Sequence, residues 1–273
     1  MSQLVIRRLL IDLDAPLERQ WCAGNAFQTA FFNALSMSFP FGEQFFIDAV
    51  RGALPLLAPD AQQGWQSEVR GFIGQEATHR RIHALFNGQL ERQGLEDSWT
   101  PRMKQRMALL EGQDPRHALA ITAATEHFTA IFADWLLRHP RTLEAVEPRL
   151  RTMWMWHAAE ESEHKCTAFD LYRAVGGAES WRRRWMRRVT LLFLTDLLRQ
   201  TVANLRHEKQ LWKRSTWRQA WQTLFSREGL LTSNVRAWRA YFRPTFHPSE
   251  QDGTLAQQWL ADHRDSYTPV GAN

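Results

Sequence analysis

The chain has 273 residues, of which 44% are apolar and 23% charged, with a mean hydropathy of −0.45 and a net charge of +5. These values are typical of a soluble globular protein that can bury a large core. No window of about 18 uninterrupted apolar residues occurs, which excludes a membrane-spanning helix, and the spacing of Cys22 and Cys166 excludes a cysteine-based metal finger.

The N-terminal apolar stretch is interrupted by Arg7 and Arg8, so no signal peptide is predicted. The two cysteines are expected to be free thiols in a reducing compartment. A cytoplasmic location is therefore expected, and peripheral contact with the inner membrane is the alternative.

Helices are predicted almost throughout, because proline and glycine cluster at a few separated points. A first helix is expected over residues 25–54, disturbed at Phe39-Pro40, and a second over 60–93. The longer connection over 95–114 contains a short helix after Thr100-Pro101. Asp114 before Pro115 is typical of a helix start. This third helix is expected to end at about residue 138. Further helices are expected over residues 147–177, 180–207, 215–225, 234–242 and 254–263, and residues 243–248 are expected to form a loop.

Four long helices with one long connection are typical of two antiparallel hairpins joined by a crossover. The predicted fold is therefore all-α, a ferritin-like four-helix bundle with additional C-terminal helices. We expect a single domain over 1–273, with its core bundle over about 25–177 and a helical extension over about 178–265.

Two Glu-x-x-His pairs, Glu76/His79 and Glu161/His164, each lie in the second helix of a predicted hairpin. Residues three apart on a helix lie roughly 60° apart around its axis, so both side chains of a pair can reach one metal ion. The alternative is that these are ordinary surface residues.

Glu43 and Glu126 lie inside apolar stretches of the two partner helices. Glu126 and Glu161 are about equally far from their turn, so an antiparallel hairpin brings them to the same height. Burying carboxylates among Phe and Ala without a cation would be unfavourable. The four helices thus offer the ligand set of a carboxylate-bridged two-metal bundle.

His157 shares one helical face with Glu161 and His164 and is predicted to be a seventh ligand. His83, one turn beyond His79, is expected to support a ligand or to lie at the surface. Three positions are expected to be ordinary surface residues: Glu160 and Glu163, which flank Lys165, and His127. His247 is expected to anchor its loop.

Carboxylates and imidazoles without thiolates suit iron, with manganese or a mixed pair as the alternative. The predicted metal ligands are Glu43, Glu76, His79, Glu126, His157, Glu161 and His164.

Three stretches and a loop resemble a bacterial family known as predicted metal-dependent hydrolases. They are Phe39–Phe46, Gln75–His83, Trp156–Asp170 and Tyr241–Pro248. The ligand motif alone is similar to that of di-iron arylamine N-oxygenases of the p-aminobenzoate type, whose set is Glu, Glu-x-x-His, Glu and His-x-x-x-Glu-x-x-His. That resemblance implies the seven ligand roles and activation of O₂, but no substrate.

The leading hypothesis is a di-iron oxygenase that N-oxygenates or hydroxylates a small apolar or aromatic substrate, with O₂ as co-substrate and an external electron donor. One alternative is a metal-dependent hydrolase that uses a bridging hydroxide. A non-enzymatic, ferritin-like iron-handling protein is another.

The basic cluster Arg182–Arg188 precedes an apolar run that contains Asp196. It suggests either a contact with the membrane surface or a helix packed on the bundle with a solvated basic end. No nucleic-acid partner is expected, because no recognition motif accompanies the cluster. A homodimer is a further alternative.

Overall fold

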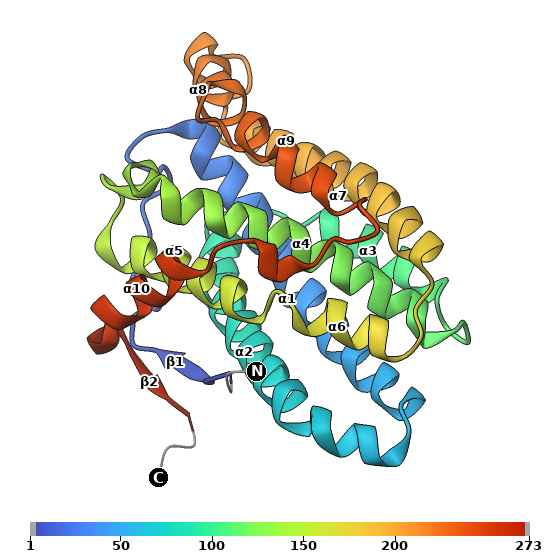
Figure 1. The fold of residues 1–273 in the computed structure, drawn as a ribbon. Coiled ribbons are helices and arrows are strands. Elements are labelled where there is room, and N and C mark those ends of the chain that lie inside the picture. Colours follow the sequence, from blue (N-terminus) through green and yellow to red (C-terminus); the bar gives the residue numbers. More distant parts are fainter. Residues whose placement is uncertain (1–3, 271–273) are drawn as a thin grey trace.

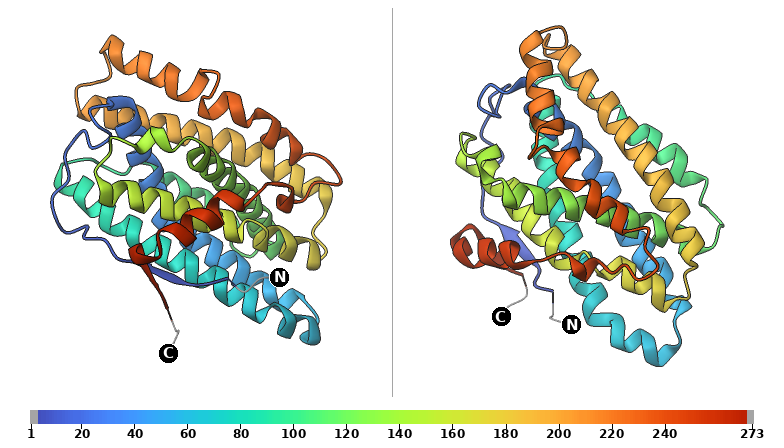
Figure 2. Two further views of the ribbon diagram at one scale, coloured as in Figure 1. Left: turned by 60° about the vertical axis from the view of Figure 1, so that its left-hand side comes forward. Right: turned by 45° about the horizontal axis from the view of Figure 1, so that its top comes forward.

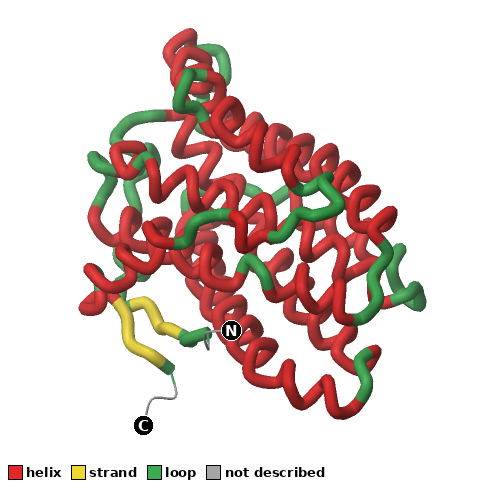
Figure 3. Tube along the Cα trace, viewed as in Figure 1, coloured by secondary structure: helices red, strands yellow, loops and turns green. Residues whose placement is uncertain are grey.

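The computed structural model describes residues 4–270 and consists almost entirely of helices (Figures 1 and 3). Four long helices form the bundle: α1 (Ala26–Ala53), α2 (Pro59–Arg92), α4 (Pro115–Arg138) and α5 (Pro148–His164). α1 packs against α2, and α4 packs against both α5 and α1. The predicted all-α helical bundle is thereby confirmed.

The remaining helices connect or cover the bundle (Figure 2). α7 (Glu179–His207) lies against α1 and α4, and α9 (Leu230–Ala240) covers α4. The other helices are α3 (Trp99–Ala108), α6 (Thr167–Ala174), α8 (Arg214–Phe225) and α10 (Thr254–Asp262), and the short 3₁₀ turns are η1 (Leu54–Leu56), η2 (Pro140–Leu143), η3 (Pro248–Glu250) and η4 (Arg264–Ser266). α3 lies in the long connection, where a short helix was expected, but begins before Thr100.

The predicted disturbance of the first helix at Pro40 is wrong, because α1 continues through it. A proline has no backbone N–H to donate to the carbonyl four residues earlier, here that of Ser36. Asn87 on α2 compensates, since its Nδ2 donates to the Ser36 carbonyl oxygen at 2.9 Å. A side chain from the neighbouring helix thus replaces the missing intrahelical bond.

The predicted single helix over 147–177 is also wrong, since it is divided into α5 and α6 at Lys165 and Cys166. Neither glycine nor proline marks this break in the sequence. The Lys165 ammonium donates to the carbonyl oxygen of Gln251 at 2.7 Å, so a distant loop contacts the chain at the break. The break leaves His164 as the last residue of α5.

Two short strands, which the sequence did not predict, join distant parts of the chain. β1 (Arg7–Leu9) pairs antiparallel with β2 (Tyr267–Pro269), with Leu9 opposite Tyr267. The segment before β1 passes close to α2, where a Cβ atom at Gly71 would lie 3.2 Å from the carbonyl oxygen of Leu4. Glycine at this position therefore allows the N-terminal segment to approach the bundle.

α7 packs on the bundle, as the position of Asp196 within its apolar run suggested, and Asp196 is buried. Asp196 forms ion pairs with Arg102, at 2.7 Å, and with Arg106. Arg182 is itself buried and donates to the carbonyl oxygens of Tyr241 and Arg243, so it is unavailable to a membrane. Within residues 4–270, none of the helices has the length and apolar character needed to cross a bilayer.

Candidate metal centre

The four bundle helices bring the seven residues singled out in the sequence into the interior. α1 supplies Glu43, α2 supplies Glu76 and His79, α4 supplies Glu126, and α5 supplies the other three. All seven are at most 4% exposed: Glu43, Glu76, His79, Glu126, His157, Glu161 and His164. Carboxylates this deeply buried require either a cation or a proton.

The two Glu-x-x-His pairs meet across the α2–α5 contact, and their four donor atoms lie within 4.8 Å of one another. His164 Nε2 lies 3.2 Å from Glu76 Oε1 and 3.6 Å from Glu161 Oε1. Glu126 belongs to the same cluster, since its Oε2 is 3.3 Å from His164 Nε2. His79 Nδ1 lies 3.4 Å from Glu161 Oε1.

A second group of donor atoms, also within 4.8 Å of one another, comes from Glu43, His157 and His83. His157 lies between the two groups, because its Nε2 is 2.9 Å from Glu161 Oε1 and 4.0 Å from Glu43 Oε1. His83 is fully buried, which excludes the surface position considered for it. Glu43 and His157 therefore lie beside the first group, as the donors of a two-metal site would, whereas both nitrogens of His83 take part in hydrogen bonds.

The donor atoms that face one another fit two cations. Among the described residues, both carboxylate oxygens of Glu43, Glu76 and Glu126 are buried without a hydrogen-bond partner. Three further atoms are also buried without a hydrogen-bond partner: His79 Nδ1, His164 Nε2 and Glu161 Oε2. Buried polar atoms are almost always paired, so a convergent set of unpaired ones points to a missing ligand. Two divalent cations would balance the charge of the four carboxylates.

The electrostatics of the site agree with this geometry. Burial, together with the Glu76 carboxylate, raises the pKa of Glu43 well above its usual value and that of Glu126 to about 8. Burial and the nearby His79 lower the pKa of His157 to about 4. Glu43 and Glu126 are therefore short of positive charge, while His157 is a neutral imidazole, the form that binds metal ions. Against the effect of burial, hydrogen bonds to Glu160 and Glu161 raise the pKa of His79 to about 10, and Glu161 and Glu126 raise that of His164. A bound cation would take the place of the protons on these two histidines.

Two of the three imidazoles are oriented by partners outside the donor cluster. His79 Nε2 lies 2.9 Å from Glu160 Oε2, and His164 Nδ1 lies 2.9 Å from Gln75 Oε1. Each histidine can donate its outward N–H to that oxygen, which directs the lone pair of its other nitrogen into the site. Such partners fix the tautomer of a metal-binding histidine.

His157 is oriented by a longer chain of hydrogen bonds. Ser36 Oγ donates to Asn87 Oδ1 at 2.7 Å, so it accepts from His83 Nδ1, 2.8 Å away. His83 Nε2 then carries a lone pair and accepts from His157 Nδ1 at 2.5 Å. His157 is left with its Nε2 lone pair directed toward Glu161. The same Asn87 that compensates for Pro40 therefore determines which nitrogen His157 presents.

The three residues expected at the surface, Glu160, Glu163 and His127, are not ordinary surface residues. Glu160 is fully buried and accepts from Arg7 at 3.0 Å, while Glu163 is partly buried and accepts from the same guanidinium. The helical wheel offered a signal for Glu160, because it lies within roughly 60° of His157. The Arg7 partner had no local signal.

His127 is the third correction, and Lys165, between the glutamates and the break, is buried as well. Lys165 pairs with neither glutamate, since its ammonium is buried and donates to Gln251 as described above. His127 is covered by α9, with its Nε2 3.1 Å from the carbonyl oxygen of Ala237. The expected loop anchor His247 is confirmed, because its Nε2 lies 2.6 Å from Asp170 Oδ1 and its side chain caps η3.

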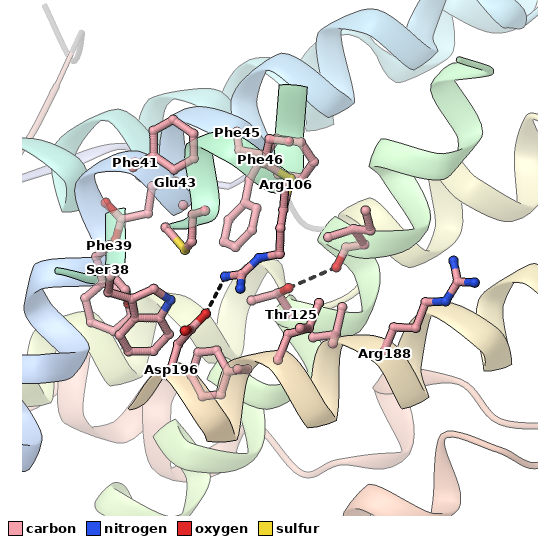
Figure 4. A pocket seen from close by; sticks show the side chains of 18 of the residues that line it. Ser38, Phe39, Phe41, Glu43, Phe45, Phe46, Arg106, Thr125, Arg188 and Asp196 are labelled. Atoms are coloured by element: carbon pink, nitrogen blue, oxygen red, sulfur yellow. Dashed lines mark hydrogen bonds and ion pairs between the residues drawn. The ribbon is translucent and has the colours of Figure 1, made fainter. Parts of the chain in front are cut away.

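Two apolar cavities border the donor cluster. The larger, about 130 Å³, lies between α1, α3, α4 and α7 and has Glu43 in its wall (Figure 4). Its lining includes Phe39, Phe45 and Phe46, and Arg106 and Asp196 are its ion-paired polar groups. The smaller cavity, about 50 Å³, borders His157 and Glu161 and shares Phe39 with the larger. Apolar space therefore meets the donors from two sides.

Comparison with curated proteins and with solved structures gives no match. A sequence family described as predicted metal-dependent hydrolase matches residues 5–252, a range that includes every donor residue of the site. With this match over nearly the whole chain, and with buried groups of carboxylates and histidines suited to metal ions, the protein belongs to the predicted metal-dependent hydrolase family.

Proposed function

We propose that this protein is a di-iron oxygenase that activates O₂ to N-oxygenate or hydroxylate a small apolar or aromatic molecule. The observation that carries the proposal is the convergence of four buried carboxylates and three buried imidazoles beside an apolar cavity, with both oxygens of three of the carboxylates lacking a hydrogen-bond partner. The proposed ligands are Glu43, Glu76, His79, Glu126, His157, Glu161 and His164. In this proposal the bundle is of the ferritin-like type, in which facing helices hold two metal ions between them.

The donor set favours iron over structural zinc. Mixed carboxylate and imidazole ligands without thiolate suit iron, with manganese as the alternative, and structural zinc sites are smaller and closed. Bound iron would supply the redox chemistry with O₂, using electrons from an external donor. The ligand motif is similar to that of di-iron arylamine N-oxygenases, which supports this class of reaction.

The chain's own residues orient the donors and exclude water. Glu160, Gln75 and His83 hold the three imidazoles so that one lone pair of each is directed inward. Phe39 packs against His83 and His157, with ring centroids 4.6 and 4.8 Å away, and lines both cavities beside the donors. A dry, apolar wall limits the access of water to a reactive oxidant.

The larger cavity supports a small substrate. A cavity of about 150 Å³ lined by apolar side chains accommodates benzene, so about 130 Å³ suits a molecule with about one ring. Glu43 in its wall would place the substrate next to the metal ligands. Besides Glu43, the Arg106–Asp196 ion pair, Arg188 and the hydroxyl groups of the lining are the polar groups that such a substrate would meet.

Hydrolysis is the second candidate, because the family description names it. Two metal ions bound by these neighbouring groups of donors could hold a hydroxide that attacks a substrate. This candidate predicts activity with redox-inert metals and without a reductant, whereas the oxygenase requires both iron and electrons.

The test begins with protein purified without O₂, whose metal content is measured before reduction and exposure to O₂. We expect about two iron ions per chain and O₂ consumption that depends on the reductant. Glu126→Ala and Glu161→Ala should each lose at least one ion, whereas Glu111→Ala, an exposed matched control, should lose none. Full metal content in both site variants would contradict the ligand assignment, and an iron-loaded, reduced protein that consumes no O₂ would contradict the oxygenase.

A further inference from the structure

The strongest unexplained surface feature is the α8 tip, residues 209–227, which lies at one end of the molecule (Figures 1 and 2). Four large aromatic side chains are exposed there. Trp212 is 89% exposed, Trp221 65%, Trp217 48% and Phe225 45%. Single exposed apolar residues need no explanation, but four aromatic ones on one short segment do.

The aromatic residues of α8 point away from the protein. Thr216, Ala220 and Thr223 are buried toward α1, where Gln28 Nε2 donates to Thr223 Oγ1 at 3.3 Å. On the opposite side, Trp217, Trp221 and Phe225 follow one another at four-residue intervals, with the last two ring centroids 5.4 Å apart. Four-residue spacing places them in one row along the helix.

Basic residues accompany this row. Arg214 and Arg218 lie on the same side of α8, within the roughly 100° arc that contains the three aromatic side chains. Lys209, Lys213 and Arg227 are also exposed, and residues 209–227 contain no acidic residue. The α8 tip therefore combines tryptophan with five positive charges.

We propose that the α8 tip docks on the surface of an anionic lipid bilayer. Tryptophan side chains favour the headgroup region, where an apolar ring meets a polar environment, and lysine and arginine are attracted by anionic lipids. The helix would lie on the bilayer rather than cross it. The surface is separate from the metal centre, so the inference does not depend on the proposed function.

A second copy of the chain fits this surface less well. A two-fold contact uses the same patch on both subunits and would place the five positive charges of one tip against five of the other. Like charges across an interface oppose association. An anionic bilayer instead complements the charge and accepts the aromatic side chains.

The experiment measures co-sedimentation of the full chain with vesicles of phosphatidylcholine alone or mixed with phosphatidylglycerol. We expect binding to the mixed vesicles, weak binding to the neutral ones, and weaker binding at high salt because salt screens charges. The double variants Trp217→Gln/Trp221→Gln and Arg214→Glu/Arg218→Glu should each weaken binding roughly tenfold or more.

The controls exchange exposed apolar side chains for glutamine, or exposed arginines for glutamate, elsewhere on the surface. They are Leu85→Gln/Leu109→Gln for exposed apolar side chains and Arg51→Glu/Arg70→Glu for exposed charges. Both should bind like the unaltered protein, and all variants should keep its thermal unfolding and metal content. The proposal is overturned if the unaltered protein ignores anionic vesicles, or if tip and control variants weaken binding equally. It is also overturned if the unaltered protein forms a dimer in solution, binds no vesicles, and loses the dimer in the tip variants. The tip would then be a contact between two copies of the chain.

Discussion

The nitrogen that each of His79, His157 and His164 directs inward depends on hydrogen-bond partners outside the proposed ligand set. For His157 the partners form a chain of hydrogen bonds from His83 to Ser36 and Asn87, and each of these bonds is buried or partly buried. Removing His83 would leave His157 Nδ1 without an acceptor in an apolar environment, so its ring could turn or present the other nitrogen.

We therefore expect His83→Leu to weaken metal affinity by about 10- to 100-fold, the usual effect of losing such a partner. Competition with a chelator would measure the affinity, and the optical spectrum of the cobalt(II)-substituted protein would report the changed geometry. His263→Leu removes an exposed histidine and should change neither. An unchanged spectrum and affinity in His83→Leu would show that His157 is oriented by other contacts.

At the scale of single elements, the sequence predicted the helices well where local signals decide. Asp114 accepts from the Arg116 N–H as the start of α4, and the row that groups His157, Glu161 and His164 follows from helix geometry alone. The seven buried donors could be proposed because Glu-x-x-His spacing is a local pattern.

What could not be predicted depends on distant contacts. Asn87 allows α1 to continue past Pro40, and Gln251 contacts the break at Lys165, although neither residue is near in sequence. Glu160 resembled a surface residue because its partner, Arg7, is 153 positions away. The aromatic side of α8 could not be assigned to solvent until its opposite side was seen to pack against α1.

β1 offers a direct test of such a distant contact. Arg7 is buried between Glu160 and Glu163, whereas its neighbour Arg8 is exposed on the same strand. Arg7→Leu would leave the fully buried Glu160 without its cation and should lower the free energy of unfolding by about 3–5 kcal/mol. Arg8→Leu should change it by less than about 0.5 kcal/mol. Urea unfolding monitored by circular dichroism would measure both, and equal values would show that the Arg7 ion pair contributes nothing specific.

For the molecule as a whole, cations and protons should compete as stabilisers of the bundle. When chelation has removed the cations, burial and Glu76 hold the pKa of Glu126 at about 8, against 4.5 normally. Below about 4.5, folded and unfolded states are both protonated at Glu126. Between about 4.5 and 8 only the folded state keeps the proton, so the stability that it contributes falls as pH rises and is lost above 8.

Metal-free protein should therefore show a lower melting temperature near pH 8 than near pH 5, and the stabilisation by added metal should grow over the same range. Differential scanning calorimetry with and without metal measures the difference in melting temperature between the two forms at each pH. In Glu126→Gln, which cannot titrate, part of the pH dependence should disappear. If this difference in melting temperature stays constant with pH in the unaltered protein, the account of Glu126 is contradicted.

The pairing of β1 with β2 also sets an order of events during synthesis. Leu9 leaves the ribosome long before Tyr267, its partner in the strand pair. Strand pairing can hold Arg7 against Glu160 and Glu163 only when β2 has emerged, although all seven donor residues are translated well before that point. The orientation of His79 by Glu160 is thus completed late, and full metal loading is expected to follow translation rather than accompany it.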